Sequence, residues 1–429
     1  MKNIQIFLFT VAIIMFVACN KTGGEPEPPE TVHYEQAKSP KRGVSYSFAG
    51  FPDEDMALLS PAATWFYNWG IDLNANIDHS ADFYDIAYVP MAWNGVNENA
   101  LRKWVAANPD CKYILAFNEP NLTDQANMTP SQAADRWGQL ANIAKELNLK
   151  IVSPAMNYGT LANYSDPIKW LDEFFAMINP DDIYAIAIHC YMGSAGAMKS
   201  YVERFKKYGK PIWMTEFCAW ENTASSTAQM QFMSEAIIYM ELDSAIERYA
   251  WFIPKWDRTG VEETPYMQLI TKTYPPELTE RGKVFTAMSA CDKYYYALAG
   301  KQIEAEHFTN CNLSQWTNRT GFARSVHFRP TTDQSGGLDI YNFTNEIWVE
   351  YQAELTQDAT YNIELRNIAA LDTDLNIYID GKIAEFASLA QTQTWTTSVF
   401  PVQISKGRHI IRLEVTDGNC ALNWIKIDF

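Results

Sequence analysis

The 429-residue sequence has no lysine- or arginine-rich run, and its 34 basic residues are outnumbered by 51 acidic ones, giving a net charge of −17. Electrostatic attraction to nucleic-acid phosphates or anionic lipid is therefore not expected. No apolar run beyond the N-terminus is long enough to span a bilayer. None of the seven cysteines has zinc-ligand spacing. These absences argue against a nucleic-acid partner and favour a neutral or cationic one.

Apolar and aromatic residues are abundant, at 47% and 14% of the chain. This content suffices for a large core, and the length favours two domains. The aromatic residues include 14 Trp and 23 Tyr. Because sugar rings present apolar C–H faces, flat amphipathic side chains suit a carbohydrate binder, with simple core packing as the alternative.

The N-terminus carries a targeting pattern. Lys2 supplies a positive charge, Ile4 to Phe16 are apolar, and Val17-Ala18 places small residues before Cys19. This pattern resembles a bacterial lipoprotein signal, which implies that residues 1–18 are removed and Cys19 is lipidated. An uncleaved membrane anchor is the alternative. Either way, we expect an exported protein attached to the cell envelope, at the outer membrane or cell surface.

Residues 19–41 are rich in Pro, Gly and Glu and lack an apolar period, which predicts a flexible linker. Six cysteines remain beyond Cys19. Cys311 and Cys420 lie near opposite ends of the last segment, where an exported sandwich could bridge them by a disulfide, and the other four are expected to be buried thiols.

Strand-like and helical segments alternate from residue 42 onward. Helical spacing of apolar residues covers Ser131 to Leu147, Pro167 to Met177 and Thr227 to Leu242, and Thr129-Pro130 is a plausible helix start. The strand-like runs are GVSYSF (43–48), TWFYNW (64–69), DIAYVPMAW (85–93), YILAFNEP (113–120), KIVSPAMN (150–157), IYAIAIHCY (183–191), PIWMTEF (211–217) and RYAWFIP (248–254). Eight such units predict an α/β fold, a (β/α)₈ TIM barrel over residues 42–299. A doubly wound open sheet is the alternative, but GVSYSFAG is not its glycine-rich phosphate turn.

The pattern changes after Gly300. Residues 300–429 contain short alternating strands separated by turn signals such as Asp380-Gly381 and Asp417-Gly418. This pattern predicts a C-terminal all-β sandwich, jelly-roll-like in form.

Polar residues stand where several barrel strands end. The fourth run ends in Asn118-Glu119, the sixth in His189-Cys190-Tyr191 and the seventh in Thr215-Glu216. Because barrel active sites lie at the C-terminal ends of the strands, both carboxylates are expected in one mouth. Glycoside hydrolysis needs two such groups, and their separation, which sequence does not give, distinguishes retaining from inverting enzymes. Two carboxyls held close together are expected to keep one proton near neutral pH.

These motifs resemble glycoside hydrolase family 128, the β-1,3-glucanases with a short barrel. GVSYSF, FYNW, YVPMAW, ILAFNEPN, SPAM, AIHCY and KPIWMTEF carry the resemblance over about residues 42–256. It implies that Glu119 is the acid/base, that Glu216 is the nucleophile and that catalysis needs no cofactor. It further implies substrate contacts or positioning roles for Asn118, His189, Tyr191, Trp251, Trp65, Trp69 and Trp93, with Trp251 beneath the sugar.

The last segment resembles carbohydrate-binding module family 6, through IEAEHF, EIWVEYQAEL, LNIYIDGK, WTTSVFPVQISKGRHIIRLE and NWIKIDF. That resemblance implies a structural calcium ion held by Glu304, Glu306 and Asp428. It also implies sugar contacts from Tyr341, Phe343, Trp395 and Asn419.

The combined prediction is a lipid-anchored endo-β-1,3-glucanase whose partner is a β-glucan polysaccharide. Two alternatives stay open: a barrel glycosidase acting on mannan, xylan or mixed-linkage glucan, and a catalytically inert surface protein that only binds glycans. The presence of both Glu119 and Glu216 argues against the inert protein, since a binder needs neither a proton donor nor a nucleophile.

Overall fold

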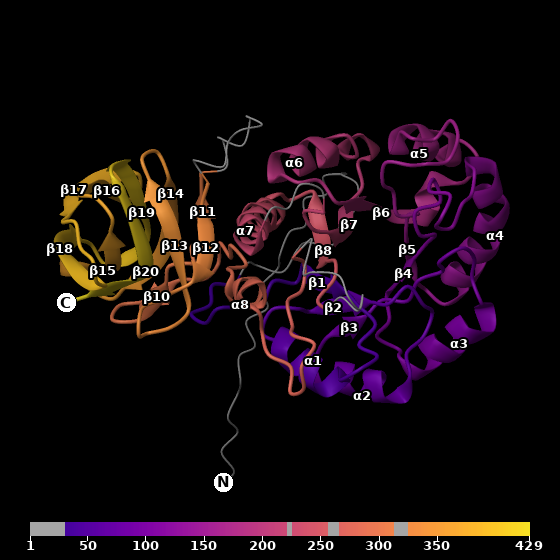
Figure 1. The fold of residues 1–429 in the computed structure, drawn as a ribbon, viewed down its shortest axis with the longest axis horizontal. Helices are drawn as coiled ribbons and strands as arrows, with labels where there is room; N and C mark the ends of the chain where they lie inside the picture. The colour runs from indigo at the N-terminus through magenta and orange to yellow at the C-terminus, as the bar shows by residue number, and fades with distance from the viewer. Residues whose placement is uncertain (1–30, 221–224, 256–265, 313–324) are drawn as a thin grey trace, which may run out of the picture.

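The computed structural model describes residues 31–220, 225–255, 266–312 and 325–429. Figure 1 shows two bodies side by side, a barrel ringed by helices and a sandwich of strands. The predicted signal (residues 1–18) and Cys19 lie outside the described residues. Among the described residues, every helix is too short or too polar to cross a bilayer.

The first body is the predicted (β/α)₈ barrel, which is confirmed. Its sheet has eight parallel strands in the order β3-β2-β1-β8-β7-β6-β5-β4. A bridge between Met91 and Leu115 and a 2.8 Å hydrogen bond from Asn118 N to Trp93 O join the β3 and β4 ends. The strands are β1 (Arg42–Ser45), β2 (Trp65–Tyr67), β3 (Ala87–Tyr88), β4 (Tyr113–Leu115), β5 (Lys150–Val152), β6 (Ile183–Cys190), β7 (Ile212–Phe217) and β8 (Ile246–Trp251).

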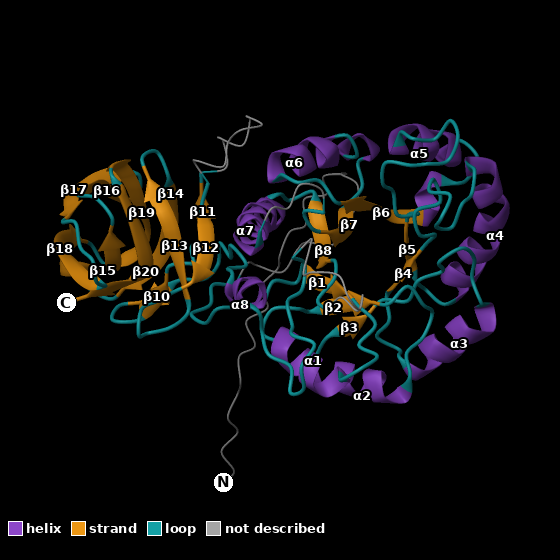
Figure 2. Cartoon of the chain, viewed as in Figure 1, coloured by secondary structure: helices purple, strands orange, loops and turns teal. Residues whose placement is uncertain are grey.

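Helices surround the sheet (Figure 2). Helix α4 begins where predicted, because Thr129 and Gln132 form a reciprocal capping box and Pro130 occupies the first turn. The helices are α1 (Pro52–Leu59), α2 (Ala75–Tyr84), α3 (Glu98–Ala107), α4 (Pro130–Glu146), α5 (Pro167–Phe175), α6 (Ala195–Glu203), α7 (Ser226–Leu242) and α8 (Glu280–Ala287), with 3₁₀ turns η1 (Pro180–Asp182) and η2 (Lys206–Tyr208).

Side chains of β2 and its extension show how the barrel interior is layered. Trp65 and Tyr67 belong to the interior cluster and Trp69 packs against it, whereas Phe66 belongs to the layer between sheet and helices. Successive strand residues point to opposite faces, so residues two apart share the interior at rising heights. Trp65 therefore lies toward the base, Tyr67 in the middle and Trp69 near the mouth.

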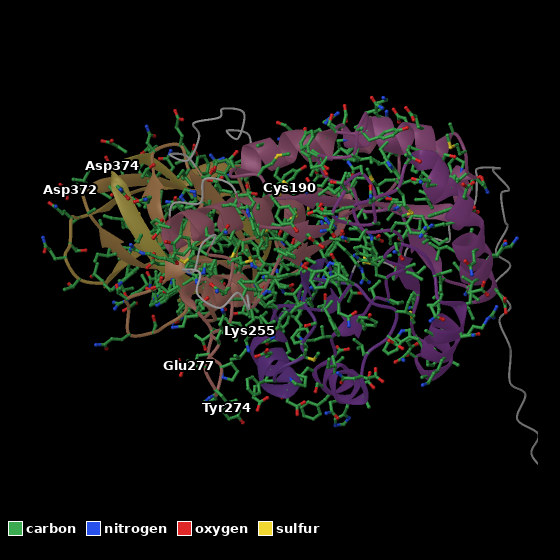
Figure 3. All side chains as sticks on the ribbon, turned by 45° about the vertical axis from the view of Figure 1, so that its right-hand side comes forward. Cys190, Lys255, Tyr274, Glu277, Asp372 and Asp374 are labelled. Carbon is green, nitrogen blue, oxygen red and sulfur yellow. The ribbon has the colours of Figure 1, made fainter. Side chains whose placement is uncertain are left out.

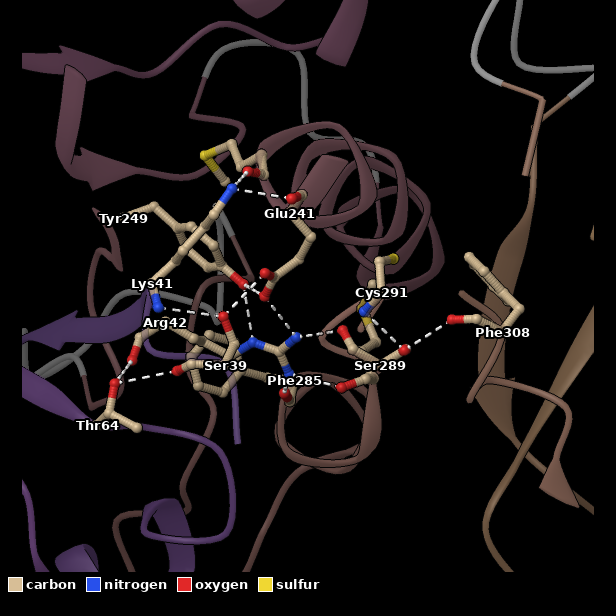
Figure 4. Close-up of polar contacts among 12 residues, drawn as sticks. Ser39, Lys41, Arg42, Thr64, Glu241, Tyr249, Phe285, Ser289, Cys291 and Phe308 are labelled. Carbon is tan, nitrogen blue, oxygen red and sulfur yellow. Dashed lines mark hydrogen bonds and ion pairs between the residues drawn. The ribbon is translucent and has the colours of Figure 1, made fainter. Parts of the chain in front are cut away.

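A buried guanidinium closes the base of the barrel (Figure 4). Arg42 donates from Nη1 to the carbonyls of Phe285 and Met288, at 2.9 and 2.8 Å, and from Nη2 to the Ser289 carbonyl at 2.6 Å. Its charge pairs with Glu241 Oε1, on α7, at 3.1 Å. These contacts attach the first strand to α7 and to the segment leading into the sandwich.

Residues 31–41 of the predicted linker contact the segment that joins the two bodies, and residues 19–30 lie outside the described residues. His33 bridges Tyr295, and its Nε2 lies 2.7 Å from Asp292 Oδ2. Lys301 Nζ donates to the Tyr34 carbonyl at 3.1 Å. The composition indicated little intrinsic structure, but docking onto the segment between the two bodies supplies the missing partners.

The second body is the predicted sandwich of two sheets. One has the order β12-β13-β20-β15-β18 with β10 beside β20, and the other has β11-β14-β19-β16-β17 with β9 beside β14. Asp380 and Gly381 turn between β16 and β17 with φ of 51° and 77°, as a tight hairpin requires. The strands are β9 (Ala297–Leu298), β10 (Gln302–Glu304), β11 (Asn310–Cys311), β12 (His327–Pro330), β13 (Leu338–Thr344), β14 (Trp348–Leu355), β15 (Ala359–Ala369), β16 (Thr373–Ile379), β17 (Lys382–Leu389), β18 (Thr396–Ile404), β19 (Gly407–Asp417) and β20 (Asn419–Asp428).

The barrel and sandwich share a packed interface formed by α7, α8 and β12. His327 Nε2 lies 2.8 Å from Glu235 Oε1, and both side chains are buried. The backbone N–H of Phe328 donates to Ser234 Oγ at 3.2 Å. Helix α7 is consequently buried on nearly all of its faces.

The predicted disulfide between Cys311 and Cys420 does not form. The six cysteines among the described residues are free thiols, and five of them are buried. Cys311 belongs to one sheet of the sandwich, and Cys420, in the other, has its Sγ 3.8 Å from the Phe343 carbonyl. Cys190 lies within the barrel, far from Asp372 and Asp374 at the outer end of the sandwich (Figure 3).

Candidate active site

A pocket of about 330 Å³ opens at the C-terminal ends of the barrel strands. Its walls contain six of the predicted site residues, together with three that were not predicted. The lining residues are Trp69, Trp93, Asn118, Glu119, Gln125, Tyr191, Glu216, Phe252 and Ile253. The fold thus brings the two predicted carboxylates, from opposite parts of the sequence, into one cavity.

Glu119 is held by the backbone beyond β4. Its N–H donates to the Ala155 carbonyl at 3.1 Å, and its φ of 42° is uncommon for a residue with a side chain. Oε1 accepts hydrogen bonds from His189 Nδ1 at 2.9 Å and from Asn157 Nδ2 at 3.1 Å. Oε2 has no protein donor among the described residues.

Glu216 is surrounded by donors at the end of β7. Its Oε1 accepts hydrogen bonds from the Tyr67 hydroxyl at 2.6 Å and from Trp69 Nε1 at 2.8 Å. Its Oε2 accepts a hydrogen bond from the Tyr191 hydroxyl. Donors therefore hold both oxygens of Glu216 in place.

His189 lies between the two carboxylates and is fully buried. Its Nδ1 is 2.9 Å from Glu119 Oε1 and 3.5 Å from Glu216 Oε2. Burial opposes charging of the ring, but the Glu216 and Glu119 carboxylates outweigh it and raise the pKa of His189.

The same proximity acts on Glu119. Burial alone would raise its pKa, but the charge of His189 and hydrogen bonds from His189 and Asn157 outweigh burial and lower the pKa. The imidazole therefore lies where its positive charge would offset the repulsion between the two carboxyls.

Two of the predicted aromatic platforms are not in the pocket. Trp65 is 1% exposed at the barrel base, where its Nε1 donates to the Lys41 carbonyl at 3.0 Å. Trp251 is fully buried outside the barrel wall, and its Nε1 donates to the Met267 carbonyl at 2.7 Å. Both assignments were wrong, whereas Trp69 and Trp93 do line the pocket.

Besides Ile253, four site residues were given no role by sequence reasoning. Tyr67 contacts Glu216, Asn157 contacts Glu119, and Phe252 lines the pocket in place of its neighbour Trp251. Gln125 accepts a hydrogen bond from Asn118 Nδ2 at 3.1 Å, while Asn118 Oδ1 is buried without a partner among the described residues. The alternation Trp65, Tyr67, Trp69 was the available signal for Tyr67.

The predicted calcium ligands are only partly together. A side chain added at Gly337 would lie 3.6 Å from both Glu304 Oε2 and Glu306 Oε1, so these two carboxylates flank one glycine. Asp428 instead pairs with Lys426, and the β10–β20 register places Glu304 opposite Trp424. The Asp428 assignment was therefore wrong. Along β20, Asp428 lies beyond Trp424, the residue opposite Glu304, so its carboxylate is not beside those of Glu304 and Glu306.

The surroundings of Glu306 nevertheless suit a cation. Its Oε2 is buried and has no partner among the described residues, and burial, reinforced by Glu304, raises the pKa of Glu306 to about 8. Asn423, on β20 next to the register partner of Glu304, also has a buried, unpartnered Oδ1. Within the described ranges, however, no cluster of three or more His, Cys, Asp or Glu is arranged to hold a metal.

The residues expected to contact sugar on the sandwich differ in exposure. Tyr341 and Phe343 are buried, which removes them as exposed platforms. Trp395 is partly exposed, and its Nε1 donates to Thr332 Oγ1 at 3.0 Å. Asn419 is also partly exposed, at the start of β20.

The barrel and its paired carboxylates define a glycoside hydrolase. Residues 43–285 match the family described as glycosyl hydrolase catalytic core. Among solved structures, the chain is similar to a GH128 subgroup II endo-β-1,3-glucanase from Pseudomonas viridiflava, at 34% identity and a TM-score of 0.52. It is likewise similar to one from Sorangium cellulosum, at 31% identity and a TM-score of 0.52. Each match covers 58% of this chain and 98% of the other.

The chain therefore belongs to the glycosyl hydrolase catalytic core family, in glycoside hydrolase family 128. It is also 25% identical over 229 residues to alkali-sensitive linkage protein 1 of Schizosaccharomyces pombe, covering 50% of this chain and 39% of that protein. Residues 319–427 match carbohydrate binding module family 35. The prediction of a carbohydrate-binding module is thus confirmed, and its assignment to family 6 is corrected.

Proposed function

We propose that this protein is a retaining endo-β-1,3-glucanase in which Glu119 is the acid/base and Glu216 the nucleophile. The similarity to two endo-β-1,3-glucanases over nearly their whole length supports the substrate class. The observation that carries the residue assignment is the unequal set of donors around the two carboxylates.

Glu216 receives hydrogen bonds on both oxygens, from Tyr67, Trp69 and Tyr191. These contacts hold the carboxylate in position for attack on the anomeric carbon. Among the described residues, Glu119 receives donors on Oε1 alone, so Oε2 is the oxygen open to the leaving group. Because the pKa of Glu119 is lowered and that of His189 is raised, we assign the donated proton to the pair that these two residues form.

Distances through His189 support the retaining mechanism. Glu119 Oε1 and Glu216 Oε2 both lie near His189 Nδ1, at 2.9 and 3.5 Å. One oxygen of each carboxyl therefore lies close to the same nitrogen atom, which places the two carboxyls near each other. A close pair suits attack by Glu216 better than insertion of a water between the carboxyls.

Other pocket residues supply contacts for the sugar. The unpartnered Asn118 Oδ1 is placed to accept a hydrogen bond from the 2-hydroxyl beside the cleaved bond, a contact that strengthens in the transition state. Phe252, at the pocket wall, takes the role beneath the sugar that was assigned to Trp251. Trp69 and Trp93 complete the aromatic lining.

We also propose a structural calcium ion in the sandwich and a lipid anchor at Cys19. The buried, unpartnered oxygens of Glu306 and Asn423, with Glu304 beside Gly337, are oxygen ligands of the type calcium takes. Calcium would offset the cost of burying the Glu306 charge. The anchor follows from the apolar N-terminal run and Cys19 alone.

The function is tested by incubating the full-length protein with laminarin, curdlan, barley glucan, mannan and xylan and measuring new reducing ends. We expect release from laminarin and curdlan, and loss of that release in Glu216→Gln. Glu173→Gln, a partly exposed carboxylate on α5, is the matched control and should retain activity. Cleavage of mannan or xylan alone would overturn the β-1,3 assignment, and binding without cleavage would overturn the enzyme mechanism.

A further inference from the structure

A second cavity lies on the opposite side of the barrel from the active site. This base cleft has a volume of about 1340 Å³ and is lined by the N-terminal ends of barrel strands, the segment before β1 and the face of the sandwich. Tyr113 begins β4, and Arg248 lies near the start of β8, so both belong to the base of the barrel. The hydrolytic mechanism uses no residue of the base cleft.

Arg248 is the unusual group of the base cleft. Its guanidinium carbon lies 4.7, 4.9 and 5.4 Å from the ring centroids of Trp213, Tyr113 and Trp65. These rings hold the cation by their faces but offer it no lone pair. Among the described residues, no acceptor is hydrogen-bonded to the guanidinium N–H groups of Arg248, and Nη1 is buried without a partner.

The carboxylates around the base cleft are already engaged by other groups. Glu247, next to Arg248 in sequence, accepts hydrogen bonds from the Tyr184 hydroxyl at 2.5 Å and from Trp213 Nε1 at 2.7 Å. The other acidic lining residues are paired elsewhere: Glu241 with Arg42, Asp292 with His33, and Glu350 with Arg412.

Two lysines add positive charge to the same lining. Lys210 Nζ donates to the Ile183 carbonyl at 2.6 Å, and neither Lys38 nor Lys210 has a carboxylate partner among the described residues. Within the described ranges, Arg248, Lys210 and Lys38 thus have no salt-bridge partner, and the charge of the neighbouring Glu247 offsets only part of their positive charge, in a protein whose net charge is −17. Such a concentration of unpaired positive charge attracts a small anion.

We propose that the base cleft binds a phosphate group, with Arg248 as its principal ligand and Lys210 and Lys38 as supporting charges. The forked N–H donors of arginine fit the oxygens of phosphate in pairs. A phosphate ester carries up to two negative charges, which balances three cations better than the single charge of a carboxylate does. The group belongs either to a soluble sugar phosphate or to a lipid headgroup, and the site is independent of the hydrolytic reaction.

Binding is tested by calorimetric titration of the full-length protein with inorganic phosphate, glucose 6-phosphate and glucuronate. We expect saturable binding of the two phosphates and weaker binding of glucuronate. Arg248→Met should weaken phosphate binding at least about tenfold, since it removes the paired charged donors. Lys210→Met, which leaves the aromatic rings intact, should weaken it less and guards against misfolding of the Arg248 variant.

Lys169→Met, on the outer surface of α5, is the matched control and should bind phosphate as the wild type does. Hydrolysis of laminarin by each variant reports an intact barrel. Sedimentation with vesicles containing phosphatidylglycerol separates the two sources: Arg248-dependent co-sedimentation assigns a lipid headgroup, and its absence assigns a soluble phosphate. No saturable binding, or equal binding by wild type and Arg248→Met, would overturn the proposal.

Discussion

His189 donates from Nδ1 toward Oε1 of Glu119 across 2.9 Å, and both side chains are buried. The imidazole therefore engages Oε1 of Glu119. In the proposed mechanism, Oε2 is the oxygen that exchanges a proton with the glycosidic oxygen. The imidazole also lies between two carboxylates that would otherwise repel each other.

The role proposed for Glu119 predicts a dependence on the leaving group. Glu119→Ala should slow hydrolysis of laminarin by about 10²–10⁴-fold, the usual contribution of a general acid. An activated aryl β-glucoside oligomer, whose leaving group needs no proton, should be cleaved with a much smaller loss in the bond-breaking step. Comparing the burst-phase rates on both substrates checks this, and equal losses on the two would contradict the acid role.

Truncating Phe252 should mainly reduce activity, whereas truncating Trp251 should mainly reduce stability. Phe252→Ala removes a pocket wall and should reduce kcat/KM on laminarin by about tenfold with little loss of stability, since one aromatic contact contributes roughly 1 kcal/mol. Trp251→Ala opens a cavity in the core and should cost about 3–5 kcal/mol of unfolding free energy. Steady-state kinetics and urea unfolding of both variants measure the contrast, and an unchanged kcat/KM in Phe252→Ala would remove it from the sugar site.

The raised pKa of His189 predicts a pH-dependent stability. Because the folded state binds this proton more tightly than the unfolded state, the contribution is fully present below about pH 6.5, the unfolded value. It is lost as pH rises through the higher folded pKa. Wild type should therefore exceed His189→Gln in unfolding free energy most at low pH, with the difference shrinking in alkaline buffer.

Chemical denaturation of both proteins across this pH range gives the difference directly. A second variant, His327→Gln, alters the other buried histidine–glutamate pair, at the domain interface, and controls for general effects of removing a histidine. A wild-type advantage over His189→Gln that stays constant with pH would contradict the proposed protonation of His189.

Removal of calcium should destabilise the sandwich. At a calcium concentration one hundred times the dissociation constant, the stabilisation amounts to about 2.7 kcal/mol. Burial raises the pKa of Glu306 to about 8, so protons compete with calcium and the effect should be smaller at about pH 6 than at about pH 9. Calorimetric melting with and without chelator measures it.

Two substitutions, one at a proposed calcium ligand and one at a carboxylate outside the site, provide the control for this prediction. Glu306→Gln should abolish the response to calcium, and Asp428→Asn, altered at a residue paired with Lys426, should leave it intact. A melting temperature that chelator does not change at any pH would contradict the calcium proposal.

The spacing of apolar residues predicted the architecture, because strands and helices each impose their own spacing on the residues that face the core. The eight barrel strands, the Thr129 cap and the Asp380-Gly381 turn follow from residue spacing and backbone preferences. The two catalytic candidates were found for the same reason, since the end of a strand is visible in sequence and barrels gather strand ends at one face.

The wrong residue assignments concern how deep a side chain lies in the barrel and to which face of the sheet it points. Trp65 does point into the barrel, but two layers below the mouth, and Trp251 points outward while Ala250 points inward. Asp428 lies on the expected strand but at the wrong register position. Such facts depend on where each strand starts relative to its neighbours, which composition and local periodicity do not encode.

The central claim is that Glu119 and Glu216 act on opposite sides of one β-1,3 linkage and that the sugar is transferred through Glu216. Proton NMR of laminarin during the first turnovers tests it most directly, because it shows the anomeric form of the new reducing end before mutarotation. The account predicts that the β-anomer appears first and that Glu216→Gln yields none. Initial accumulation of the α-anomer would contradict it.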